Sequence, residues 1–361
     1  SRTSCNTESD TRATMNRNLR NVLMTYCPKG NRRWFTGIPS ETAFTNYVSR
    51  VKRNQMIKDG HEFLHDEALF NSDNEVLVFD KSLVLVQSNF EKELSFQAVR
   101  TTWKGINKFL QRPLTEWIGK SVFIQVSIEN KLLHAVDVSF GNEEFKRQIS
   151  ETCQGQFETF RQAFLFLPEV EAGLVSKACA LLRWNRVNQF CSKCGGKCVS
   201  SQSGCSNTCV KCKKTHYPIS SPVVITLPVS PDGQKALLVR GNRHPPGLYS
   251  CVAGYVDYGE DVDQCLRREV AEEVGLTVIK SEYVGSQHWP FPGSSLMIGC
   301  IATVLPQQVD IDYNELEDAR WVSKKEVIQL MSGDKQDLEE ILWLPPKGTI
   351  AHKLINKWVT S

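Results

Sequence analysis

Three glutamates, Glu269, Glu272 and Glu273, lie three and four positions apart in a segment with helical periodicity. At this spacing the carboxylates emerge on one face of a helix. Like charges held together repel one another unless a cation neutralises them. Oxygen ligands in a partly hydrated site suit Mg²⁺, and Mg²⁺ suits phosphates. The segment therefore predicts a magnesium-dependent phosphate site, and the alternative is a solvated acidic face.

The residues around these glutamates predict a glycine-containing loop followed by a helix. Gly254 gives the loop free dihedral angles, the helix begins near Asp261, and Gly275 ends it. Arg268 is expected to pair with Glu260 and so fix the loop against the helix. Apolar residues at i, i+4 spacing are expected to anchor the helix, namely Val262, Leu266, Val270 and Val274.

A second group of residues with metal-binding potential consists of two C-x2-C pairs, namely Cys191, Cys194, Cys209 and Cys212. Two residues between thiols let both sulfurs of a tight turn meet one ion, and two such pairs complete a tetrahedral site. Because protein fills all four positions, we expect the zinc to be structural and not catalytic. Cys198 and Cys205 are surplus, and ligand sets that use them stay open.

The acidic segment has the complete order G-x5-E-x7-R-E-U-x-E-E-x-G-U, where U is a bulky aliphatic residue, from Gly254 to Leu276. This order resembles the motif of the Nudix hydrolases in full. The resemblance implies an α/β fold, the Nudix α/β/α sandwich, and hydrolysis of a nucleoside diphosphate linked to another group. The cysteine ribbon before the motif and the segment 286–297, Ser-Gln-His-Trp-Pro-Phe-Pro-Gly-Ser-Ser-Leu-Met, are similar to the NADH pyrophosphatase branch.

This chain departs from the branch at three places. His288 stands where most of the branch has proline, one residue is inserted near Gly293, and Tyr255 stands where phenylalanine is common. These departures concern the fit of the ligand and leave the catalytic class unchanged.

The resemblance also implies roles for individual residues. Glu269, Glu272 and Glu273 are the implied catalytic residues and ligands for Mg²⁺ or Mn²⁺, with Glu273 as the base. Glu315 adds a later carboxylate to the same metal site. Tyr255 and Trp289 look like an aromatic pair that stacks on nicotinamide, with Trp289 reaching across a homodimer. The other implied substrate-binding residues are Tyr217, Gln287, Ser295, Met297 and Ala351.

These roles predict that the protein hydrolyses the diphosphate bond of NADH and NAD⁺ to nicotinamide mononucleotide and AMP. A metal-bound water of lowered pKa is expected to attack phosphorus in line. One alternative is the removal of NAD caps from RNA 5′ ends, with Lys211, Lys213, Lys214 and His216 beside the ribbon as a basic track. A solvated edge of the ribbon is the preferred interpretation of these four residues. Another is a zinc-ribbon binding module with an inactive hydrolase domain, against which the intact motif argues.

The length of 361 residues predicts more than one domain. We expect a basic tail in 1–55 with little fixed structure, an N-terminal α+β domain in 56–168, a linker helix and zinc ribbon in 169–218, and the Nudix domain in 219–361. Expected strands are Glu75–Phe79, Ser82–Val86, Val122–Ile128, Leu132–Phe140, Val223–Leu227 and Lys235–Val239, and a helix should follow Pro168 as far as Trp184. Pro228 is expected to mark an edge or a bulge.

Charge and hydropathy provide the evidence from which we predict the location of the protein. A net charge of +3 gives no bulk basic field that would favour nucleic acid. The apolar run Leu296–Leu305 is well short of the roughly twenty residues that a spanning helix needs. Between Thr11 and Ser40 there is no acidic residue, but there are Arg12, Arg17, Arg20, Lys29, Arg32 and Arg33. This pattern is typical of a mitochondrial transit peptide, and the alternative is a disordered basic tail on a cytoplasmic protein.

Overall fold

The computed structural model describes seven stretches of the chain: 47–59, 73–89, 95–110, 121–127, 131–291, 293–332 and 342–361. The arginine-rich stretch from Thr11 to Ser40 and the end of the expected strand at Ile128 lie outside them. The chain divides into two compact units, Ser1–Val51 and Lys52–Ser361, and the domains below belong to the second. No helix among the described residues is long and apolar enough to cross a membrane.

A mixed sheet forms the centre of the N-terminal domain. The strand order is β3 (Ser95–Ala98), β2 (Leu83–Asn89), β1 (Glu75–Asp80), β6 (Leu132–Asp137) and β5 (Ser121–Val126), with β4 (Arg100–Thr102) beside β1 and β7 (Gln156–Thr159) beside β2. Strands β1 and β6 are parallel, whereas β5 and β6 form an antiparallel pair. This arrangement is the expected α+β domain.

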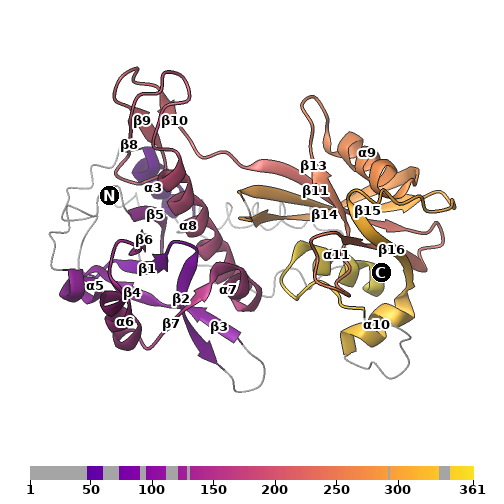
Figure 1. Ribbon diagram of the computed structural model, residues 1–361, viewed down its shortest axis with the longest axis horizontal. Coiled ribbons are helices and arrows are strands. Elements are labelled where there is room, and N and C mark those ends of the chain that lie inside the picture. Colours follow the sequence, from indigo (N-terminus) through magenta and orange to yellow (C-terminus); the bar gives the residue numbers. More distant parts are fainter. Residues whose placement is uncertain are drawn as a thin grey trace, which may run out of the picture. The chain divides into compact units, whose positions relative to one another are not determined.

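Helices bury both faces of this sheet. On one face α7 (Phe160–Phe166) and α8 (Glu169–Val187) pack against strand residues such as Phe79 and Ile124. On the other face α5 (Trp103–Leu110) and α6 (Glu143–Thr152) pack through Trp103 and Ile149. The apolar spacing after Pro168 thus produces the predicted long helix, which Figure 1 shows running from the sheet to the cysteine ribbon.

The expectation of little fixed structure before about residue 55 is wrong for its last part. Helix α3 spans Tyr47–Asp59. Its C-terminal half packs on the N-terminal domain, because Ile57 is 2% exposed and the Asn54 side chain accepts a hydrogen bond from Val126 N at 2.8 Å. These partners lie far along the chain, so the local composition could not indicate them.

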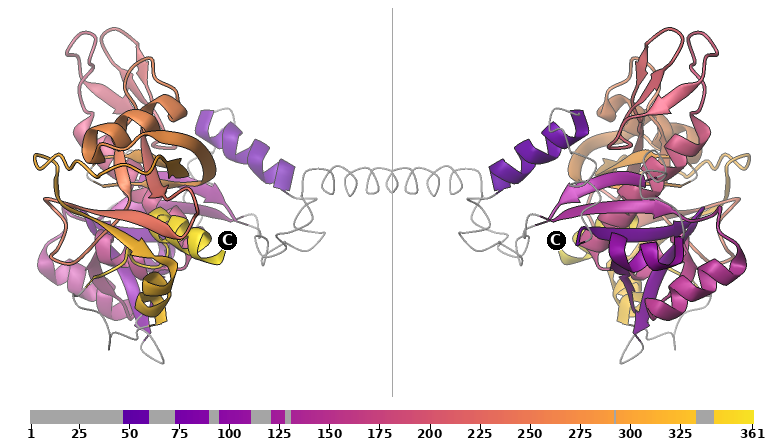
Figure 2. Two further views of the ribbon diagram at one scale, coloured as in Figure 1. Left: turned by 90° about the vertical axis from the view of Figure 1, so that its right-hand side faces the viewer. Right: turned by 90° about the vertical axis from the view of Figure 1, so that its left-hand side faces the viewer.

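The cysteine ribbon is a small sheet of β8 (Cys198–Ser200), β9 (Asn207–Cys209) and β10 (Thr215–His216) at the end of α8 (Figures 1 and 2). Its β8–β9 turn docks on β5, where Phe123 N donates to Ser203 O at 2.8 Å. Gly204 has φ +66, and a Cβ there would overlap Val122. Only glycine therefore permits this close approach.

The C-terminal domain contains a second mixed sheet between helices. The order is β14 (Val278–Trp289), β15 (Ser295–Val304), β11 (Ser221–Val229), β12 (Lys235–Gly241) and β16 (Leu316–Ser323), with β13 (Val252–Tyr255) beside β11. Helix α9 (Val262–Val274) covers one face, and α11 (Ile350–Thr360) and α10 (Lys324–Ser332) cover the other. The result is the predicted α/β/α sandwich.

Pro228 does not end its strand, contrary to the expectation of an edge or bulge. Strand β11 is central and continues to Val229, with Pro228 opposite Ala302 of the parallel strand β15. On its other side β11 pairs with β13 up to Thr226 and with β12 at Val229. Proline, which lacks an N–H, thus lies between the two pairings of that side.

Candidate active site and zinc centre

Helix α9 carries the acidic residues and has strong signals at both ends. The Asp261 side chain accepts from Gln264 N at 2.8 Å, and the Gln264 side chain accepts from Asp261 N at 2.8 Å, which completes a capping box. Gly275 ends the helix with φ +66, the left-handed conformation that glycine adopts freely. On the buried side, Leu266 and Val270 pack on the sheet. These contacts fix which carboxylates face inward.

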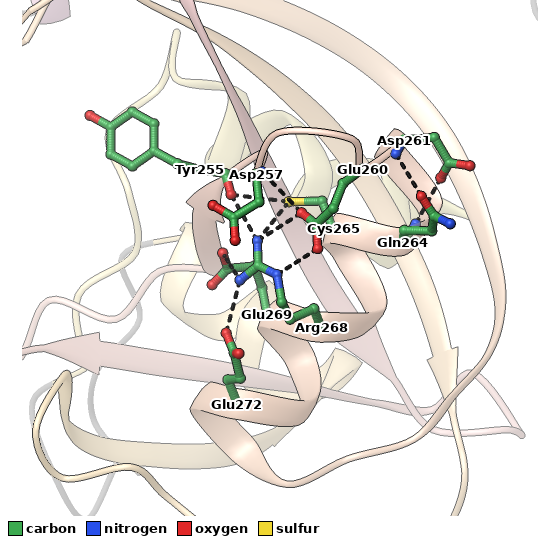
Figure 3. Close-up of polar contacts among 9 residues, drawn as sticks. All are labelled: Tyr255, Asp257, Glu260, Asp261, Gln264, Cys265, Arg268, Glu269 and Glu272. Atoms are coloured by element: carbon green, nitrogen blue, oxygen red, sulfur yellow. Dashed lines mark hydrogen bonds and ion pairs between the residues drawn. The ribbon is translucent and has the colours of Figure 1, made fainter.

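Arg268 ties the preceding loop to this helix. Its Nε donates to Glu260 Oε1 at 2.7 Å and its Nη2 donates to Glu260 Oε2 at 2.9 Å and to Tyr255 O at 2.9 Å. Glu260 also accepts from Asp257 N at 3.0 Å. The hydrogen bonds from Arg268 lower the pKa of Glu260 to about 2. The predicted pairing of Arg268 with Glu260 is therefore confirmed, and Figure 3 shows it.

The same guanidinium also contacts two of the three clustered glutamates. Arg268 Nη1 donates to Glu269 Oε1 at 2.7 Å and to Glu272 Oε2 at 2.8 Å. Glu272 is largely exposed, whereas Glu269 is only 9% exposed. Burial raises the pKa of Glu269 while the bonds from Arg268 oppose this shift. One cation thus partly neutralises three carboxylates of the loop and helix.

Glu273 lies deepest of the cluster. It is 5% exposed, and its Oε2 atom has no hydrogen-bond partner among the described residues. Burial, with the nearby charges of Glu269 and Glu315, raises its pKa to about 8. An acceptor oxygen buried without a donor is costly, and a cation satisfies it. The chemistry of this position therefore fits a divalent metal ion.

Gly254 brings the loop into direct contact with the acidic cluster. A Cβ atom at this position would overlap the carboxylate of Glu269. The motif's first glycine is needed here for close approach, and its backbone conformation is not of the left-handed kind.

Glu315 approaches the cluster from the loop before β16. Its charge contributes to the raised pKa values of Glu273 and Glu269, and its carbonyl accepts from Asn242 N at 3.2 Å. The four glutamates expected to bind metal do not converge as a ligand group: among the described residues, the cysteine cluster is the one group of three or more potential ligands whose ligand atoms all lie within 4.8 Å of one another. The ion pairs of Glu269 and Glu272 with Arg268 orient these two carboxylates toward the guanidinium.

The four cysteines of the C-x2-C pairs do converge. Cys191 Sγ lies 3.6 Å from Cys212 Sγ, and Cys194 Sγ lies 3.5 Å from Cys209 Sγ. All four sulfurs lie within 4.8 Å of one another. Such a thiol-only group suits zinc.

The structure separates the surplus cysteines from this group. Cys205 belongs to the core of the N-terminal domain and is directed to Phe123 O at 3.9 Å. Cys198 lies opposite Cys209 on the neighbouring strand but outside the ligand group. His216 contacts Cys191 Sγ through Nε2 at 3.2 Å, the kind of contact that orients a metal-binding side chain. Sequence spacing did not indicate this role for His216.

The residues expected to bind substrate differ in environment. The Gln287 side chain makes two hydrogen bonds to the backbone: its amide nitrogen donates to Gly348 O at 2.6 Å, and its amide oxygen accepts from Ile350 N at 2.8 Å. Ala351, in the first turn of α11, and Ser295 are buried. Gln287 thus holds the N-terminus of α11 against β14.

The other candidate substrate-binding residues, three aromatic residues and Met297, are more exposed to solvent. Tyr255 is 57% exposed, and Figure 3 shows its ring directed away from Arg268. Tyr217 is exposed between the ribbon and β11. Trp289 is half-buried and packs edge-on against Phe164 of α7 at 5.4 Å. Met297 is half-buried over the α11 face of the sheet.

Comparisons with known proteins agree with this architecture. A NUDIX domain model matches residues 220–344. The chain is 41% identical to human NAD(P)H pyrophosphatase NUDT13, mitochondrial, over 255 residues, which are 67% of this chain and 72% of that protein. The chain belongs to the Nudix hydrolase family.

Further similarity extends over other members of this family. Human NAD-capped RNA hydrolase NUDT12 is 39% identical over 60% of this chain and 47% of its own length. NAD-capped RNA hydrolase NudC of Pseudomonas aeruginosa is 38% identical over 49% of this chain and 57% of its own length. Among solved structures, the NUDIX domain of Shewanella oneidensis NrtR complexed with ADP ribose matches 39% of this chain and 87% of that chain with 21% identity and a TM-score of 0.31.

The structure also assigns contacts in this Nudix hydrolase that the motif does not encode. The imidazole of His288 links Ser176 of α8 to Ser294. The only sequence signal for this link is that histidine replaces the proline of the branch. Spacing alone also gives no distinction between exposed Glu272 and buried Glu273, because that difference depends on how α9 packs on the sheet.

Proposed function

We propose that this Nudix hydrolase cuts the diphosphate bond of NADH and NAD⁺ to give nicotinamide mononucleotide and AMP. The observation that carries the proposal is Glu273, a buried carboxylate with an unpartnered oxygen at the complete Nudix motif. The relatives named as NAD(P)H pyrophosphatase and as NAD-capped RNA hydrolases support the NAD diphosphate as the bond that is cut.

The proposed metal ligands are Glu269, Glu272, Glu273 and Glu315. A Mg²⁺ or Mn²⁺ ion bound there supplies charge that neutralises the diphosphate and lowers the pKa of a coordinated water. Arg268 holds the loop of Gly254 against α9 and thereby keeps the carboxylates oriented. Glu273 is the proposed base that accepts the proton of the attacking water.

Further residues are proposed to contact the substrate. Tyr255 and Trp289 are proposed to contact the nicotinamide ring, since aromatic faces suit a flat heterocycle. Gln287 is proposed to act through the backbone it fixes at Gly348 and Ile350. The further proposed contacts are Tyr217, Ser295, Met297 and Ala351.

We also propose a zinc ion at the four-cysteine cluster and a homodimer as the active form. The zinc is structural in this proposal, because all its ligands come from the protein. Light scattering of the purified chain tests the dimer, and the mass of a single chain at micromolar concentration contradicts it.

The decisive experiment is an assay of the purified chain with Mg²⁺ against NADH, NAD⁺, ADP-ribose and NAD-capped RNA. We expect NADH and NAD⁺ to be cut at the diphosphate, with AMP released. Failure to cut either dinucleotide under conditions in which another nucleotide substrate is cut contradicts the proposal.

Removal of NAD caps is the second candidate, because exposed Lys211, Lys213 and Lys214 lie beside the zinc cluster. A basic track of this kind neutralises RNA phosphates and makes binding salt-dependent. If capped RNA is the substrate, Lys211→Ala with Lys213→Ala and Lys214→Ala should weaken its turnover but leave NADH turnover unchanged. If the triple variant turns over both substrates as the unaltered protein does, the result favours the small dinucleotide as the substrate.

A further inference from the structure

The connection between β14 and β15 is attached to the N-terminal domain through a histidine. His288 Nδ1 lies 2.6 Å from Ser176 Oγ on α8, and His288 Nε2 lies 2.8 Å from Ser294 Oγ. Ser176 is 1% exposed, so this hydrogen bond is sheltered from water. Both ring nitrogens are thus engaged, one with another domain and one across the connection.

The neighbouring aromatic residues extend the same attachment. Trp289 packs against Phe164 at 5.4 Å and against Phe291 at 5.3 Å. Phe291 in turn packs against Phe160 at 5.0 Å. Trp289 and Phe291 join the apolar core that the N-terminal sheet forms with α7 and α8. The aromatic rings and the imidazole therefore both attach the connection to the N-terminal domain, through α7 and α8 respectively.

These contacts lie among residues proposed to bind substrate. His288 stands between Gln287 and Trp289, and Ser294 directly precedes Ser295. In the β14–β15 ladder, His288 lies opposite Leu296 and Trp289 lies opposite Ser295. The bond between His288 and Ser294 therefore lies at the end of the hairpin, where the pairing of β14 with β15 stops. The bond to Ser176 attaches this end of the hairpin to α8.

We propose that His288 is a positioning residue for the nicotinamide half of the substrate: it holds the described parts of the β14–β15 connection, residues 288–291 and 293–295, against α8 so that Trp289 presents its ring to the nicotinamide. This inference rests on the proposed function, because it assumes that Trp289 contacts the dinucleotide. It also gives the N-terminal domain a role in shaping the substrate site of the Nudix domain.

The chemistry of the imidazole suits this task. Burial lowers the pKa of His288 from its ordinary value, so the ring is neutral at pH 7. A neutral imidazole has one donor and one acceptor nitrogen, and each serine hydroxyl serves as either. Both bonds are made at once without a buried charge. Proline at this position would make neither bond.

The test uses His288→Ala, Ser176→Ala and the double variant. A buried hydrogen bond contributes roughly 0.5–1.5 kcal/mol, which corresponds to about a two- to tenfold change in an equilibrium constant. Because the bond acts on binding, KM for NADH should rise by about that factor while kcat stays near its original value. The double variant should be no worse than the poorer single variant, since both remove the same bond.

Two controls separate positioning from loss of folded protein. ADP-ribose has the same diphosphate but no nicotinamide, so its KM should stay unchanged in all three variants. Ser332→Ala removes a hydroxyl whose hydrogen bond among the described residues is within its own helix, to Gln329 O, and should leave the kinetics of both substrates unaffected. Partial unfolding would lower kcat for both substrates alike and would leave KM alone.

A binding measurement distinguishes the two proposals. NADH is added to the protein in the absence of metal, and binding is measured by the quenching of tryptophan fluorescence. If the unaltered protein binds NADH but does not cut it when Mg²⁺ is present, the proposed function is wrong. The weaker binding expected of His288→Ala then still tests the positioning role. If His288→Ala and Ser176→Ala bind and cut NADH as the unaltered protein does, the positioning role is wrong. No binding of NADH by the unaltered protein overturns both proposals.

Discussion

Glu273 and Glu272 are neighbours in sequence but occupy opposite electrostatic environments. Glu272 is exposed and contacts Arg268, whereas Glu273 is buried beneath the loop with one oxygen lacking a donor. Burial and nearby carboxylates raise the pKa of Glu273 to about 8, which describes a carboxyl group poised to take up a proton or a cation. A residue in this state is expected to contribute to chemistry more than to stability.

The first prediction concerns Glu273→Gln, which removes the charge and nearly preserves the shape. Turnover should fall by at least roughly a hundredfold, the lower end for loss of general acid–base catalysis. The melting temperature should not fall, because burial disfavours the charged carboxylate at this position and the amide carries no charge. Glu282→Gln is the matched control, since Glu282 is 57% exposed and pairs with Lys357 on the surface. Near-normal turnover of folded Glu273→Gln protein would mean that the motif is not the catalytic centre.

The second prediction concerns the close approach at Gly254. Gly254→Ala puts a methyl group where the Glu269 carboxylate lies, so either the loop or the carboxylate must move. We expect kcat to fall by at least about tenfold, because small misplacements of catalytic groups are costly. Gly173→Ala is the control: nothing lies within 4 Å of its Cβ, and alanine in a helix stabilises by roughly 0.5–1 kcal/mol. Wild-type kcat for Gly254→Ala refutes the tight contact.

At the scale of single residues, the sequence indicates residue types and spacing but not how deeply each side chain is buried. The pairing of Arg268 with Glu260 follows from the motif. The link from Glu269 to Arg268 and the contact of His216 with Cys191 do not, because they depend on side-chain positions in three dimensions. The role of Glu273 as base stays a prediction until the variant is measured.

At the scale of elements, local patterns predict most of the regular structure. Periodic apolar residues after Pro168 predicted a helix, and α8 spans Glu169–Val187. Alternating residues near Val122 predicted a strand, and β5 spans Ser121–Val126. Contacts between distant segments account for the errors: α3 packs on β5 through Asn54, and Pro228 fits a central strand between two partial pairings.

The third prediction concerns the zinc ribbon as a metal-dependent element. Purified protein should contain about one Zn²⁺ per chain, since a four-cysteine site holds one ion. Cys191→Ser should lose this zinc, whereas Cys198→Ser should keep it, because Cys198 lies outside the ligand group. Metal analysis by mass spectrometry decides the matter. Protein purified without chelators that contains no zinc would refute the site, and loss of zinc from Cys198→Ser would add that thiol to it.

Loss of zinc should affect more than the ribbon. The ribbon turn docks on β5 through Ser203 and Gly204, and the Asn185 side chain of α8 donates to Gly204 O at 2.7 Å. Binding energy at a structural zinc site is folding energy. The N-terminal domain, and not the α9 cluster, is therefore the part expected to loosen in the Cys191→Ser protein.

At the scale of the whole molecule, the three parts depend on one another. The ribbon contacts the N-terminal sheet at β5, and the aromatic rings of the β14–β15 connection pack against α7. None of these contacts follows from a motif, because each joins segments that are distant in sequence and have different periodicities. The fold class was predictable because each part has its own local signal.

The last prediction concerns where the protein is directed. The stretch from Thr11 to Ser40 contains five arginines, one lysine and no acidic residue. A negative potential inside an organelle draws such a segment inward, with about 2.3 kcal/mol per charge for each 100 mV. Residues 1–46 fused to a fluorescent reporter should therefore accumulate in mitochondria. Replacement of Arg12, Arg17 and Arg20 by glutamate keeps the length but reverses the charge, so this matched variant should stay in the cytosol. Diffuse cytosolic signal from the unaltered fusion would contradict the targeting role, and mitochondrial signal from both fusions would show that charge does not direct it.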